Sequence, residues 1–141
     1  MPTLFIRNVK QFPGVAPGGG IEGVPQAVGE AYEEARDAMA AGSNTASVLM
    51  SRKLLMNIAV AQGADEGKTF VEYVEHLAKD GYVPPNGKGW VDHIRSKGNE
   101  ATHEVKIMSA EDAKELITFT EMLLRFIYEF PTRVPAPPST P

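Results

Sequence analysis

Cysteine is absent from this sequence, so disulfide bonds and thiolate metal ligands are excluded. Basic residues are also few, with 14 lysines and arginines against 18 acidic residues and a formal net charge of -4. Indiscriminate binding to nucleic acid needs a dense basic surface, and this charge balance argues against such binding. A local basic patch is still compatible with the net charge.

Long apolar runs are missing as well. The N-terminal residues MPTLFIRNVKQFPG hold too short an apolar run for a signal peptide. No stretch of the sequence approaches the roughly 20 apolar residues of a membrane helix. We therefore expect no membrane partner, and a cytoplasmic location is the simplest interpretation.

The composition is that of one folded domain with tails. The chain has 141 residues, of which 43% are hydrophobic, enough for one core. Residues 1–24 are rich in proline and glycine and predict an extended N-terminal arm. Residues 25–131 place apolar side chains at helical spacing, whereas residues 132–141 form a proline-rich tail that we expect to be disordered. The sequence therefore predicts an all-α fold, an up-and-down bundle of four to five helices.

The first three helices have recognisable ends. Pro25 suits the first turn of a helix, and Gly42 suits its C-terminal stop. Either Ser43 or Asn44 can cap the second helix, and Thr69 can cap the third. The second helix is apolar around most of its girth, which is typical of a central helix. Its expected core residues are Val48, Leu49, Leu55, Ile58 and Ala59.

The last two helices flank a polar segment. The fourth should begin near Trp90, with Gly98 ending or kinking it. The fifth should begin after Ser109, because Asp112 follows three residues later as in a capping box. Pro131 should stop it. Four aromatic residues at core spacings are interpreted as packing residues: Tyr32, Trp90, Phe126 and Tyr128.

The segment DHIRSKGNEATHE carries the candidate chemistry. Arg95, Asn99 and His103 follow one another at intervals of four, so on a continuous helix they would share one broad face. Arginine can hold a phosphate by two hydrogen bonds, and histidine can transfer a proton near neutral pH. This set would suit RNA cleavage by attack of the 2′-hydroxyl, with no metal or cofactor required.

A structural role for the same residues fits the spacing equally well. Arg95 and His103 can pair with carboxylates such as Glu104 and lock a kinked helix junction. Lys97, Glu104 and Arg52 are further candidates for binding, and the charge of Arg52 on an apolar helix should have a carboxylate or a helix end as partner. The spacing of Asp92, His93 and His103 matches no known metal-binding motif, so we expect no metal site.

Three blocks of the sequence resemble the family called domain of unknown function 4145, which is grouped with the HEPN-like helical domains. They are YEEARDAMAAGSNTASVLMSRKLLMNI, WVDHIRSKGNEATHE and SAEDAKELITFTEMLLRFIYEFP. The resemblance covers roughly residues 25–131 and implies a bundle of four or five helices. It also implies links to restriction, phage defence or toxin-antitoxin biology.

The resemblance carries two functional expectations. Many HEPN domains are homodimers whose Arg and His residues form a metal-independent ribonuclease cleft, whereas others are non-catalytic dimerisation or protein-interaction modules. Here Arg95 and His103 are further apart than in the usual HEPN signature, and Met56 stands where relatives often carry a glutamate. The expected partners are therefore a second copy of the chain, an RNA or another protein, and both functions stay open.

Overall fold

The computed structural model describes residues 19–84, 87–100 and 107–134, without the side chains of Arg95 and of residues 97–100. Within these ranges the chain is all-helical, as predicted, and has no strand. The elements in chain order are α2 (Gln26–Ala40), α3 (Asn44–Ala61), α4 (Phe70–Lys79), α5 (Lys88–Glu100), α6 (Ala110–Leu124), the π-helical turn η2 (Arg125–Glu129) and α7 (Phe130–Arg133). In these ranges no helix is both long and apolar enough to cross a membrane.

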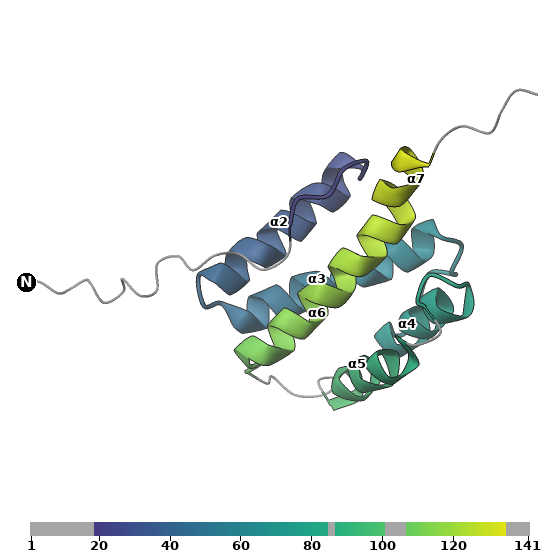
Figure 1. Ribbon diagram of the computed structural model, residues 1–141. Helices are drawn as coiled ribbons and strands as arrows, with labels where there is room; N and C mark the ends of the chain where they lie inside the picture. The colour runs from purple at the N-terminus through teal and green to yellow at the C-terminus, as the bar shows by residue number, and fades with distance from the viewer. Residues whose placement is uncertain (1–18, 85–86, 101–106, 135–141) are drawn as a thin grey trace, which may run out of the picture.

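Helix α3 is the centre of the bundle. It contacts α2, α4 and α6, while α5 packs on α4. Figure 1 shows α2 on one side of the adjacent α3 and α6, with α4 and α5 on the other side. Buried side chains from α2, α3, α4, α5 and α6 form one continuous core. The core is therefore organised around α3, as its nearly uniform apolarity predicted.

The predicted helix ends are largely confirmed. Gly42 follows α2 with a φ of 84°, a conformation that glycine adopts without a steric penalty. Ser109 and Asp112 form the predicted capping box, and so do Thr69 and Glu72 at the start of α4. Ser43 occupies the position before α3, but its side chain makes no capping hydrogen bond.

The prediction that Leu49 belongs to the core was wrong. Leu49 is 58% exposed, because the buried face of α3 lies on the other side of the helix. That buried face includes two small polar residues, Ser47 and Ser51. Ser47 donates a hydrogen bond of 2.7 Å from its Oγ to the carbonyl oxygen of Ala35 on α2, so a serine stands where α2 and α3 meet.

The C-terminal helix also differs from the prediction. It continues through Pro131 to Arg133, and it passes through the π-helical turn η2 instead of staying α-helical. Pro131 removes one backbone donor directly after η2, and it lies in the first turn of α7. Phe126 was wrongly interpreted as a packing residue, since it is 44% exposed on η2.

Candidate functional site: the Arg52 pocket beside helix α5

A small pocket lies where α3, α4, α5 and α6 meet. Arg52 and Val48 contribute from α3, Phe70 from α4 and Ile94 from α5, and the start of α6 provides the rest of its lining. The lining is mainly apolar, with Arg52 as its one cation among the described residues. The pocket therefore places one cationic side chain beside the helix that carries the predicted polar residues.

Phe70 is the direct neighbour of the Arg52 guanidinium. The Cζ atom of Arg52 lies 4.6 Å from the centroid of the Phe70 ring, within the range of a cation–π contact. Phe70 is the first residue of α4, and the capping box before it fixes the start of that helix. In this box the Thr69 Oγ1 accepts a hydrogen bond of 3.1 Å from the Glu72 backbone, and Glu72 Oε1 accepts one of 2.9 Å from the Thr69 backbone.

The surroundings of Arg52 differ from the prediction that its charge has a carboxylate or a helix end as partner. Partial burial lowers the pKa of its guanidinium from the usual value, because burial disfavours the charged form. The predicted carboxylate or helix-end contact is not found among the described residues, where the contact is with the Phe70 ring. An arginine held by an aromatic face keeps its N–H donors available for a planar or anionic group.

Two carboxylates line the pocket from α6. Asp112 Oδ2 accepts a hydrogen bond of 3.3 Å from the Ser109 backbone within the capping box. Glu115 Oε1 lies 3.0 Å from Nε2 of His93, which belongs to α5. Both carboxylates are therefore already engaged, and the His93–Glu115 pair ties the exposed side of α5 to α6.

Two further contacts join the helices that line the pocket. The ring of Trp90 on α5 meets Phe119 on α6 edge to face, with centroids 5.1 Å apart. Before α6, the backbone N–H of Met108 donates a hydrogen bond of 2.9 Å to Thr45 Oγ1 at the start of α3. The pocket is thus built by contacts between helices that are distant in sequence.

The structure tests only the backbone of the predicted catalytic set. Arg95 and Asn99 are both on α5, which continues to Glu100. Of the two predicted roles of Gly98, ending the helix was therefore wrong, and kinking it stays a prediction. Their side chains, and that of Lys97, lie outside the described part of the structure. His103 and Glu104 also lie outside the described residues. The convergence of Arg95, Asn99 and His103 therefore stays a prediction.

Comparison with known proteins adds a family. A family model described as "Domain of unknown function (DUF4145)" matches residues 33–138. The chain belongs to this family. No curated protein and no solved structure matches the chain.

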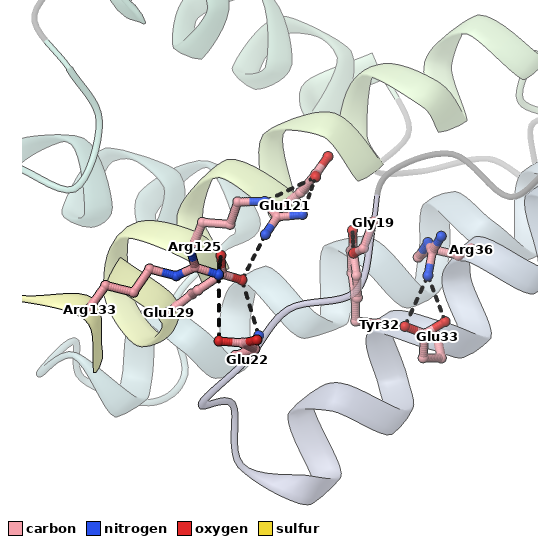
Figure 2. Close-up of polar contacts among 9 residues, drawn as sticks. All are labelled: Gly19, Glu22, Tyr32, Glu33, Arg36, Glu121, Arg125, Glu129 and Arg133. Carbon is pink, nitrogen blue, oxygen red and sulfur yellow. Dashed lines mark hydrogen bonds and ion pairs between the residues drawn. The ribbon is translucent and has the colours of Figure 1, made fainter. Parts of the chain in front are cut away.

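The DUF4145 chain has a second polar cluster that the sequence reasoning missed (Figure 2). Arg125 on η2 donates to Glu121 Oε2 at 2.8 Å and to Glu129 Oε1 at 2.7 Å. The hydrogen bond to Glu121 is the main reason that the pKa of Arg125 is raised above its usual value. Arg133 reaches Glu129 Oε2 at 3.2 Å. Glutamate and arginine alternate every four residues from Glu121 to Arg133, and this spacing was the available signal.

The same cluster holds the last part of the N-terminal arm. The backbone N–H of Glu22 donates a hydrogen bond of 3.1 Å to the buried Glu129 carboxylate. Next to it, a Cβ on Gly23 would lie 2.7 Å from the carbonyl oxygen of Tyr128, so only glycine permits this approach. We call residues 19–24, which lie against α2 and η2 in Figure 2, the strap.

Tyr32 completes the contact with the strap. Its hydroxyl donates a hydrogen bond of 3.3 Å to the carbonyl oxygen of Gly19. Burial, with a smaller contribution from the nearby Glu121 carboxylate, raises the pKa of Tyr32 to about 12. Because every group in this cluster has a partner, its arrangement fits a structural role better than a reactive one. Among the described residues, no group of three His, Asp or Glu side chains could hold a metal ion.

Proposed function

We propose that this DUF4145 chain is a HEPN-like module that acts on RNA in the cytoplasm, in nucleic-acid or defence biology. One observation supports it most directly. Arg52 contacts the Phe70 ring instead of a described carboxylate, in a pocket that Ile94 also lines. Ile94 precedes Arg95 on α5, so a base bound at Arg52 would lie beside the helix that carries the predicted polar residues.

The proposed chemistry is transfer within the RNA strand. The 2′-oxygen of one nucleotide attacks the adjacent phosphorus, the bond to the 5′-oxygen breaks, and a 2′,3′-cyclic phosphate forms. His103 takes the proton of the 2′-hydroxyl or supplies one to the departing 5′-oxygen, and solvent balances the other proton. Arg95 stabilises the charge on the phosphate, and Asn99 orients the reacting groups.

The test is cleavage of a mixed single-stranded RNA pool in buffer with EDTA. Wild type should cleave it to products with 2′,3′-cyclic phosphate ends, and the His103→Ala variant should not. The matched control is His76→Ala, because His76 lies on α4 and contacts the Gln62 carbonyl oxygen and Asp80 instead of the pocket. RNA cleavage that His103→Ala leaves unchanged would refute the assigned chemistry.

A second function, dimerisation without catalysis, has its own supporting observation. Phe126 and Phe130 are 44% and 41% exposed, and their rings meet edge to face with centroids 5.3 Å apart. Val134, at the end of α7, is a further exposed apolar residue, 66% exposed. The proposed occupant is the same surface of a second copy, which a two-fold axis would bring together.

Sedimentation measurements over a range of concentrations test this second function. Wild type should form a dimer that Phe130→Ser dissociates, whereas Leu49→Ser, on an exposed residue of α3, should leave the dimer intact. A wild-type chain that stays monomeric at high concentration would exclude dimerisation.

A further inference from the structure

The Arg52 pocket is lined by one donor group and two acceptor groups. Arg52 offers guanidinium N–H donors from α3, and the carboxylates of Asp112 and Glu115 line the pocket from α6. A single cation with two carboxylates is poorly matched to a bare anion, since the carboxylates would repel it. The pocket better suits a flat, neutral ligand that accepts hydrogen bonds on one edge and donates them on another.

We propose that the Arg52 pocket is a subsite for a guanine base of single-stranded RNA. This inference rests on the proposed action on RNA and identifies the base that is recognised. The O6 and N7 atoms of guanine accept two hydrogen bonds from an arginine fork, the most common specific contact of this base. The N1–H and the 2-amino group of guanine donate, and the Glu115 carboxylate is the acceptor on the α6 side of the pocket.

The existing contacts of Glu115 are compatible with this role. Its Oε1 atom meets His93 at 3.0 Å, and a carboxylate has about four lone-pair positions, so further donors can bind. The residue is only partly covered, with 41% of its side chain exposed. His93 thereby holds the carboxylate at the pocket while leaving it capable of accepting the guanine donors.

The shape of the pocket indicates how deeply a base would bind. The space inside the pocket that a water molecule can enter is only about 30 Å³, enough for about one water. The volume reaches about 370 Å³ only when the solvent in front of the pocket is included. A base is therefore too large to enter the pocket, and in this proposal it lies across the mouth, beside the Phe70 ring and the Arg52 guanidinium.

Other bases fit this arrangement less well. Adenine presents an amino group where guanine has O6, so it would place a donor against the Arg52 donors. Pyrimidines lack the N7 acceptor and would lose one of the two arginine hydrogen bonds. We expect guanine to bind roughly tenfold more tightly than adenine at this position, as for a good two-pronged arginine contact.

The experiment measures the affinity of the full chain for fluorescein-labelled ten-nucleotide RNAs by fluorescence anisotropy. Each RNA is a run of uridines with one central guanosine, adenosine, inosine or 7-deazaguanosine. Guanosine should bind most tightly. Inosine lacks the 2-amino group and 7-deazaguanosine lacks N7, so each should bind several-fold more weakly.

Variants of the pocket then assign the preference to its residues. Arg52→Lys keeps the charge but removes the fork, so it should abolish the preference for guanosine while retaining binding to uridine RNA. Glu115→Gln should reduce the difference between guanosine and inosine. Lys53→Ala, on the exposed neighbour of Arg52, is the matched control and should keep the full preference.

The possible failures are distinguishable. If wild type binds all four RNAs equally, or if Arg52→Lys keeps the guanosine preference, the guanine subsite is refuted and the proposed action on RNA stands. If wild type binds none of the RNAs at millimolar concentration, both proposals are refuted. Circular dichroism of each variant confirms that a lost preference does not reflect unfolding.

Discussion

Replacing Glu129 with alanine should destabilise the fold by about 2–3 kcal/mol. The residue is 4% exposed, and its carboxylate accepts hydrogen bonds from the side chain of Arg125 and from the backbone of Glu22. Removing one member of a fully buried ion pair costs about 3–5 kcal/mol. The expected loss here is smaller, because Arg125 keeps Glu121 as a partner and 25% of its side chain reaches solvent.

The measurement is urea unfolding followed by circular dichroism and by Trp90 fluorescence. Glu129→Gln keeps the volume of the side chain and one acceptor oxygen, so it should lose only about half as much stability as Glu129→Ala. Glu34→Gln, on the exposed face of α2, is the matched control and should stay within about 0.5 kcal/mol of wild type. Unchanged unfolding of Glu129→Ala would refute the idea that this carboxylate holds the strap to η2.

Three further predictions concern single side chains. Ser51→Ala should leave the melting temperature unchanged or raise it, because the Ser51 hydroxyl is buried without a hydrogen-bond partner among the described residues; a loss above about 1 kcal/mol would contradict this. The free energy of unfolding of the wild type should fall as the pH rises from 10 to 12, because the pKa of Tyr32 is about 12 in the folded state and about 10 in the unfolded state. Urea titrations of Tyr32→Phe should show a smaller fall over the same pH range. Leu55→Ala should lose about 2–5 kcal/mol in thermal unfolding, whereas Leu49→Ala should lose under about 0.5 kcal/mol, and equal losses would contradict the assigned burial.

Local signals in the sequence predicted much of the fold. The capping box at Ser109 and Asp112 depends on residues three positions apart, so the sequence alone contains it. The apolar spacing of Val91 and Ile94 likewise places both in the core, where the structure finds them. The all-helical bundle also followed from patterns that lie within single helices, and the family from three blocks of sequence that resemble it.

The remaining features depend on contacts between distant segments. Phe70 meets Arg52, and Glu22 meets Glu129 across 107 positions, and no local pattern predicts either contact. Leu49 was misplaced because the buried side of α3 is set by how α2 and α6 pack on it, which hydrophobicity does not encode. Of the candidate site, the sequence identified Arg52 but not the ring that holds it.

The strap has a practical consequence for where this domain begins. The family match starts at residue 33, downstream of Glu22, Gly23 and the Tyr32 hydroxyl. A fragment cut at that residue would expose the Glu129 carboxylate that the strap covers, and it would also lose the first turns of α2. A unit that keeps these contacts therefore begins no later than Gly19, fourteen residues before the boundary that the family match alone indicates.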